Sequence, residues 1–141
     1  MKKILFTFLI IFIGQYAFAQ IQSIHLADGY AVYKTAKGGE IEPTLSYETK
    51  VEGEDIDEET ITKLINMANN LIIPTLKSRR SYAPLGYQVK FKPKKNGKHK
   101  YSVWVSYAAT NSYGGEVDGF EQIEFNHKFR ETAGSVMLRM N

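Results

Sequence analysis

The 141-residue chain contains no cysteine. It therefore has no disulfide, no thiol nucleophile and no thiolate metal site, and it cannot carry the lipid-modified cysteine of a lipoprotein. Also missing are an H-E-x-x-H metal motif, a G-x-S-x-G nucleophile elbow and a glycine-rich phosphate loop. His25, His99 and His127 are scattered along the sequence. These absences favour a protein that is not an enzyme and uses no metal or cofactor, with a site assembled only by folding as the alternative.

Residues 1–19 have the layout of a secretory signal peptide. Two lysines precede an apolar run over 4–13, and the small-residue pattern that a signal peptidase recognises ends at Ala19, which puts the cleavage before Gln20. The apolar run is shorter than the roughly 20 residues of a membrane span. We therefore expect one domain over 20–141. It would be periplasmic or extracellular after cleavage and would contact the membrane only through the uncleaved signal peptide.

Charge is distributed unevenly along this domain, although 16 bases and 15 acids give a total of only +1. Residues 28–59 hold ten acids and three bases, whereas residues 60–115 hold ten bases and no acid. Residues 116–141 hold five acids and three bases. A stretch of 56 residues without a carboxylate predicts a surface that attracts an anionic partner.

Residues 24–51 are predicted as a β-hairpin. Apolar and polar residues alternate in its second half, which is the period of a half-buried strand. Gly38-Gly39 is a two-residue turn signal, and a loop there would pair Val32 with Leu45.

Residues 57–73 are predicted as an amphipathic helix. Asp57 is a good N-cap, and two glutamates in the first turn suit the positive end of the helix dipole. Pro74 would end or kink the helix. The acidic run over 52–59 lacks the order of a calcium-binding loop and is interpreted as the entry to the helix. The apolar stripe comprises Ile61, Leu64, Ile65, Ala68, Leu71 and Ile72.

Three antiparallel strands are predicted over 86–129. A loop with an odd number of residues between the first two strands would pair Phe91 with Val103 and keep the apolar residues on one face. A three-residue loop ending at Gly115, in the left-handed conformation, would then pair Val103 with Phe125. The expected fold class is α+β: a single antiparallel sheet of order β-β-α-β-β-β with one main helix packed on one face.

Two short motifs resemble those of a group of small, uncharacterised exported bacterial domains. That group pairs an L-K-x-P-x-S-[YF] stretch with a later A-x-N-x-[FY]-G-G turn. Here the sequence reads LKSRRSY over 76–82 and ATNSYGG over 109–115, with Arg79 where the group has proline. The resemblance implies a fold context and no catalytic activity. The second motif is interpreted as turn chemistry built on Asn111 and the glycines, with a binding site as the alternative.

The basic stretch supplies the candidate contact residues. An aromatic side chain that alternation places on the polar strand face is added to them as a contact for a partner or a sugar ring. The alternatives are a solvated sheet face for the bases and cover by the C-terminal tail for the aromatic ring. The candidate contacts are Arg79, Arg80, Lys92, Lys94, Lys95 and Trp104.

The sequence thus favours a small exported, non-enzymatic binding module that uses a basic hairpin face. Its partner would be an anionic macromolecule, either a protein or a glycan, and an inhibitor or immunity-type protein is one version of this function. Nucleic acid is not expected, because the compartment lacks it and the domain is not strongly basic overall. The alternatives are an enzyme with a fold-assembled site and a self-associating structural protein that forms homo-oligomers.

Overall fold

The computed structural model describes residues 23–27, 30–47, 50–51, 54–92, 98–133 and 135–139. The expected signal peptide and its cleavage point between Ala19 and Gln20 lie outside these residues, as do Lys94 and Lys95. Within the described ranges, no helix is long and apolar enough to cross a membrane.

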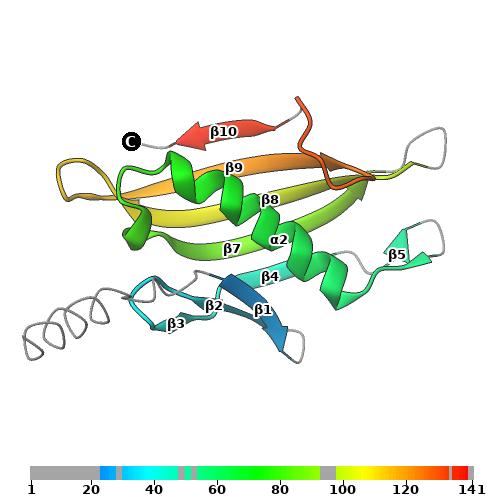
Figure 1. Ribbon diagram of the computed structural model, residues 1–141, viewed down its shortest axis with the longest axis horizontal. Helices are drawn as coiled ribbons and strands as arrows, with labels where there is room; N and C mark the ends of the chain where they lie inside the picture. Colours follow the sequence, from blue (N-terminus) through cyan, green and yellow to red (C-terminus); the bar gives the residue numbers. More distant parts are fainter. Residues whose placement is uncertain are drawn as a thin grey trace, which may run out of the picture.

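A five-stranded sheet of order β10-β9-β8-β7-β4 forms the centre of the molecule (Figure 1). Its three long strands are antiparallel: β7 (Ala83–Lys92), β8 (Lys100–Thr110) and β9 (Glu116–Asn126). Strand β4 (Thr44–Tyr47) runs parallel to β7, and β10 (Val136–Arg139) runs antiparallel to β9. The two short strands are therefore the edges of this main sheet.

The remaining strands form two smaller sheets, so the fold is α+β but the prediction of a single sheet is wrong. Strands β1 (Ser23–Ala27), β2 (Tyr30–Lys34) and β3 (Glu40–Ile41) form an antiparallel sheet. Strands β5 (Lys50–Val51) and β6 (Glu54–Asp55) form a short ribbon before the helix.

Pro43 explains why the predicted N-terminal hairpin forms only beside its turn, where β2 pairs with β3 in a register other than the predicted one. It lies between β3 and β4, outside both strands, and its missing N–H prevents a continuous ladder of hydrogen bonds. The predicted second strand is thus divided between two sheets. Tyr33 pairs with Ile41 in the small sheet, whereas Leu45, the predicted partner of Val32, pairs with β7 of the main sheet.

The predicted helix is confirmed as α2 (Glu58–Ile72). Asp57 caps it, because its side chain accepts a hydrogen bond of 2.7 Å from the backbone N–H of Thr60. Pro74 ends it within the 3₁₀ turn η1 (Ile73–Thr75), which a second turn, η2 (Arg79–Ser81), follows. The side chains of the apolar stripe that are fully buried are Ile61, Leu64, Ile65, Ala68 and Ile72.

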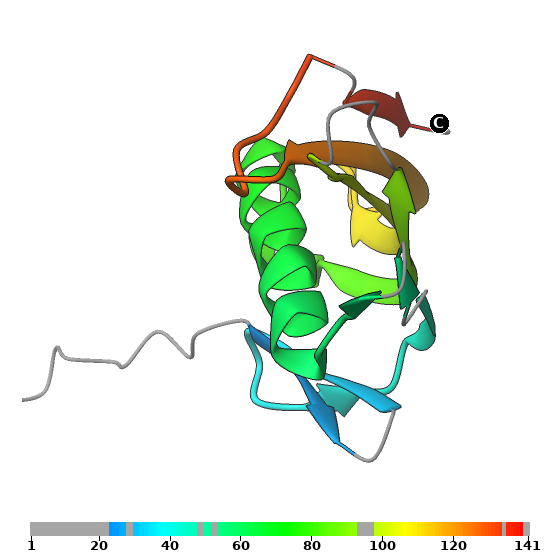
Figure 2. The same cartoon turned by 90° about the vertical axis from the view of Figure 1, so that its right-hand side faces the viewer.

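The main sheet curves around α2 (Figure 2). We call the sheet face that contacts α2 the inner face and the opposite face the outer face. The buried side chains of Val103 and Val105 belong to the inner face. Trp104 alternates with them and contacts Phe120, with ring centroids 5.3 Å apart, on the outer face, as predicted.

The long strands pair with the predicted faces together, but their register is shifted by two residues from the predicted one. Val103 pairs with Val89 and Ile123, not with the predicted partners Phe91 and Phe125. The hairpin loops are longer than expected: the loop between β8 and β9 covers five residues, 111–115. An even shift leaves every side chain on its predicted face, so the core residues of β7, β8 and β9 were still correctly predicted.

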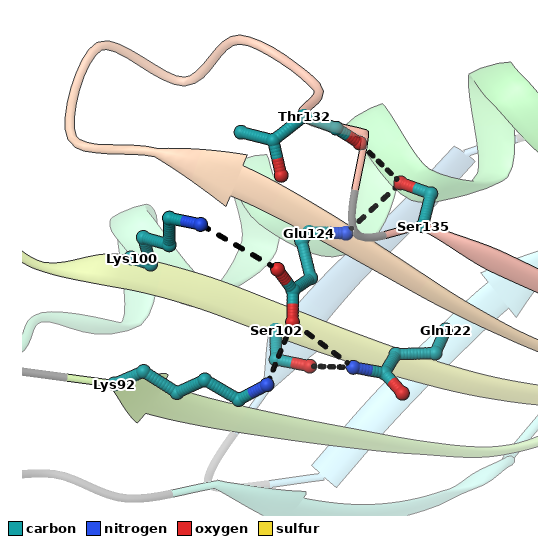
Figure 3. Close-up of polar contacts among 7 residues, drawn as sticks. All are labelled: Lys92, Lys100, Ser102, Gln122, Glu124, Thr132 and Ser135. Carbon is teal, nitrogen blue, oxygen red and sulfur yellow. Dashed lines mark hydrogen bonds and ion pairs between the residues drawn. The ribbon is translucent and has the colours of Figure 1, made fainter.

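The C-terminal segment returns along β9. The N–H of Thr132 donates to the carbonyl oxygen of Glu124 at 2.8 Å. The N–H of Glu124 also donates to Ser135 Oγ at 3.2 Å, as Figure 3 shows. Strand β10 then pairs with β9 and extends the sheet at its edge (Figure 1).

Candidate functional site

A pocket of about 450 Å³ lies at the end of the main sheet where β8 turns into β9. One wall is the segment Leu76–Lys77, which follows α2. The other walls come from the end of β8 with its loop, namely Tyr107 and residues 109–113, and from the start of β9, residues 117–119. The volume is within the range of small-ligand pockets. The structure therefore offers a concave surface to which a ligand or a partner side chain could bind.

Tyr107 and Gly119 form the floor of this pocket. They pair across β8 and β9, and a Cβ added at Gly119 would lie 2.2 Å from Tyr107 Cζ. The tyrosine ring therefore lies directly over the glycine, in space that any side chain there would occupy. Its hydroxyl donates a 2.8 Å hydrogen bond to Oε1 of Glu121, which is fully buried. Glycine and glutamate together fix the position of the ring.

A buried network of tyrosine hydroxyls lies behind this floor. Tyr82 donates to Asn69 Oδ1 at 2.7 Å, and Asn69 Nδ2 donates to the hydroxyl of Tyr87 at 2.9 Å. The Tyr82 ring contacts that of Tyr107, with centroids 5.3 Å apart. Burial raises the pKa of Tyr87 to about 12 and also raises the pKa of Tyr82. These hydroxyls therefore stay neutral near pH 7 and serve as fixed hydrogen-bonding groups.

The two motif segments of the sequence meet at the rim of the pocket. The backbone N–H of Thr110, in the second motif, donates a 2.7 Å hydrogen bond to Ser81 Oγ in the first. Ser81 in turn donates to the carbonyl oxygen of Ser78 at 2.7 Å. Figure 1 shows the segment after α2 passing beside the β8–β9 hairpin. Residues that are about 30 positions apart in the sequence thus form one surface.

The turn chemistry predicted for Asn111 is present. Its Oδ1 accepts hydrogen bonds of 2.9 Å from the backbone N–H groups of Tyr113 and Gly115. The residue with positive φ is Gly114, at 82°, and not Gly115 as predicted, because the loop is two residues longer. The turn leaves Tyr113 96% exposed beside the pocket, which Tyr113 also lines. The motif is therefore both a turn and a wall of the pocket.

Opposite charges lie on the pocket walls. Lys77 lines one side and Asp118 the other, and Arg79 and Arg80 follow Lys77 in η2. Arg79 donates to the carbonyl oxygen of Pro74 at 3.3 Å. Lys77 and Arg80 form no ion pair with the described part of the chain. Their positive charges are therefore available to a ligand.

A second polar cluster lies on the outer face, at the opposite end of the strands. Glu124 accepts a 2.6 Å hydrogen bond from Lys92 Nζ and lies 3.8 Å from Lys100 Nζ (Figure 3). Gln122 Nε2 donates to Glu124 Oε1 and to Ser102 Oγ, at 3.2 Å each. Glu124 is only 8% exposed. These contacts link β7, β8 and β9. They also give the buried carboxylate of Glu124 partners within the chain, so its burial does not require a bound ligand.

The four predicted contact residues that the structure describes, Arg79, Arg80, Lys92 and Trp104, do not form one compact patch. Arg79 and Arg80 precede β7, whereas Lys92 ends it, and a ten-residue strand spans roughly 33 Å. Trp104 lies between these ends on the outer face. Lys92 is also engaged by Glu124.

Sequence reasoning missed the residues that form the pocket floor. Alternation from Ile123 and Phe125 places Glu121 on the inner face, so a buried carboxylate could have been noticed. No signal in the sequence shows that Tyr107 lies over Gly119, because that contact depends on the register of two strands.

No family model, curated protein or solved structure matches the chain. No group of three or more His, Asp and Glu side chains that could hold a metal ion occurs among the described residues. Function must therefore be inferred from the geometry of this α+β fold and its pocket.

Proposed function

We propose that the chain is a small exported, non-enzymatic binding module for an anionic protein, with the pocket as its contact site. One observation supports this function most: Lys77 lines a pocket with an aromatic floor, and Arg80 follows Lys77 closely in the sequence. An apolar side chain of the partner would enter the pocket, and carboxylates around that side chain would meet the two cations. An inhibitor or immunity-type protein is one version of such a module.

The pocket has the features of an interface anchor point. Its floor is the ring of Tyr107, and its rim carries the exposed ring of Tyr113. Enclosed pockets that accept a single aromatic or aliphatic side chain contribute much of the binding energy of protein interfaces. Asp118 on the opposite wall would favour one orientation of the partner over its reverse.

The buried polar groups near the pocket support binding rather than catalysis. Glu121 accepts the hydroxyl hydrogen of Tyr107, and Asn69 bonds the tyrosines behind it. Each group holds an aromatic ring in place. A rigid, preorganised pocket loses less conformational entropy on binding than a mobile one.

The test is a pull-down with residues 20–141, which contain every described element, from envelope and culture-supernatant fractions. The double variant Lys77→Glu/Arg80→Glu is compared with Lys34→Glu/Lys37→Glu, an equal charge change at exposed positions in β2 and in the turn that follows it. We expect a partner that is captured at low salt, released at high salt, and bound at least about tenfold more weakly by the first variant alone.

Two results would contradict this function. Equal loss of binding by both double variants would mean that only net charge matters. Unchanged binding by Lys77→Glu/Arg80→Glu would remove the pocket rim from the interface. The affinity of each purified variant for the captured partner should be measured by titration calorimetry, because capture alone does not locate the site.

A further inference from the structure

The outer face of the main sheet carries an aromatic pair that the pocket does not use. Trp104 of β8 and Phe120 of β9 have ring centroids 5.3 Å apart, at an interplanar angle of 56°. Both side chains are partly exposed. The face around them is polar, so burial in the core does not explain two adjacent aromatic rings at this position. A half-buried aromatic pair on a largely polar sheet face is compatible with a binding surface.

Phe120 pairs with Leu138 of β10 on one side. Hydroxyl and amide side chains flank the pair elsewhere: Trp104 pairs with Gln88 and Gln122, and Phe120 pairs with Ser106. These groups donate and accept hydrogen bonds but carry no charge. Their arrangement suits a ligand that combines an apolar ring face with many hydroxyl groups.

The same face is cationic toward the end that holds Lys92 and Lys100. These two lysines share the single carboxylate of Glu124. Lys90, which pairs with Ser102, is exposed and forms no ion pair with the described residues. Three ammonium groups thus face one carboxylate, and this end of the outer face is complementary to an anionic ligand.

We propose that the outer face binds an acidic polysaccharide. A sugar ring would pack its C–H face on the Trp104–Phe120 pair, its hydroxyls would bond the flanking glutamine and serine side chains, and a uronate carboxylate would meet Lys90. A polysaccharide fits better than a protein here, because an extended chain can lie along a sheet face without a pocket to receive a side chain. This site is independent of the pocket.

The chain offers a direct reporter for the test, because Trp104 is its sole tryptophan. Tryptophan fluorescence of residues 20–141 should be followed while polygalacturonate is added. We expect a saturable change in emission that weakens as salt rises. Dextran, a neutral polysaccharide, and polyglutamate, an acidic polymer without sugar rings, should each bind at least about tenfold more weakly.

Variants locate the contact on the outer face. Phe120→Ala and Lys90→Glu both keep the tryptophan, and each should weaken polygalacturonate binding by about tenfold. Lys34→Glu, with the same charge change as Lys90→Glu, should bind like the wild type. Near-identical thermal melts would show that each variant is folded.

Three outcomes would overturn the proposal: no change in Trp104 emission with polygalacturonate, equal binding of polyglutamate or dextran, or equal weakening by Lys34→Glu. None of them bears on the protein partner at the pocket, because the Lys77→Glu/Arg80→Glu comparison tests that site separately.

Discussion

At the scale of single residues, Gly119 determines whether the pocket keeps its shape. A Cβ at this position would lie 2.2 Å from Tyr107 Cζ, so the ring would have to move and lose its hydrogen bond to Glu121. We expect Gly119→Ala to lower the free energy of unfolding by about 2 kcal/mol, the usual cost of overpacking. Urea denaturation measures this change.

Gly39→Ala is the matched control for that substitution. A Cβ at Gly39 meets only Thr35 Oγ1, at 3.5 Å, and Gly39 does not have a positive φ. We expect an effect within about 0.5 kcal/mol. Similar losses for the two variants would show that the close approach of Tyr107 to Gly119 is not what makes this position sensitive.

Phe129 occupies a position for which two other turns use glycine. In the loops that begin at Thr35, Asn111 and Asn126, the fourth residue donates its N–H to the carbonyl oxygen of the first, at 2.9–3.2 Å. That fourth residue has a positive φ in each loop: 86° at Gly38, 82° at Gly114 and 57° at Phe129. A bulky residue is strained in this conformation, so its side chain must compensate.

The ring of Phe129 makes two contacts that can compensate for this strain. It stacks on Tyr101 with centroids 5.3 Å apart, and Lys63 Nζ lies 4.0 Å from its centroid. We expect Phe129→Ala to destabilise the fold by about 2 kcal/mol, because it loses the ring contacts and keeps the strain. Phe129→Gly should cost about 1 kcal/mol less, since glycine adopts positive φ freely. If chemical denaturation shows that the Phe129→Ala variant is as stable as the Phe129→Gly variant or more stable, this explanation is contradicted.

At the scale of elements, α2 packs against the sheets through its apolar stripe, and only some side chains of that stripe are fully buried. Leu64 is 0% exposed, whereas Leu71, which was predicted for the same stripe, is 37% exposed. Leu64→Asp would bury a charge among apolar side chains at a cost of several kcal/mol, and we expect it to unfold the domain. Leu71→Asp should cost less than about 1 kcal/mol. Circular dichroism melts separate these outcomes, and a cooperative, wild-type-like melt for Leu64→Asp would contradict this packing.

The elements also show how far local patterns predict structure. The cap at Asp57, the stop at Pro74 and the outward orientation of Trp104 were predicted, because each depends on a few neighbouring residues. The strand registers were displaced by two residues, because loop length depends on hydrogen bonds such as those of Asn111 with its own turn. The predicted N-terminal hairpin forms only in part, for another reason. Strand β4 pairs with β7, about 40 residues later, and no local pattern reports such a pairing.

At the scale of the whole molecule, the buried tyrosines make stability sensitive to high pH. Burial raises the pKa of Tyr87 to about 12, and the pKa values of Tyr33 and Tyr82 are also raised. In the unfolded chain a tyrosine titrates near 10. The folded state therefore binds more protons above pH 10, and the free energy of unfolding should fall as pH rises from about 10 through 12. Below pH 10 this contribution is complete.

Urea unfolding at pH 9 and pH 11 tests this dependence. Wild type should be less stable at pH 11, and the stability difference between wild type and Tyr87→Phe should shrink, because phenylalanine has no proton to lose. Parallel losses in the two proteins would show that Tyr87 does not contribute to the pH dependence.

The candidate site shows which information is local and which is not. The sequence by itself determined the helix with its cap, the alternation of the long strands and the segregation of charge, since each depends on residue type and short spacing. The export signal stays a prediction. Only the tertiary structure decided that the motifs over 76–82 and 109–115 meet around one pocket. It also decided that Tyr107 lies over Gly119 and that Arg79 and Lys92 lie at opposite ends of β7. The physical reason is that these contacts depend on strand register and on long-range pairing, which the packing of the whole core selects.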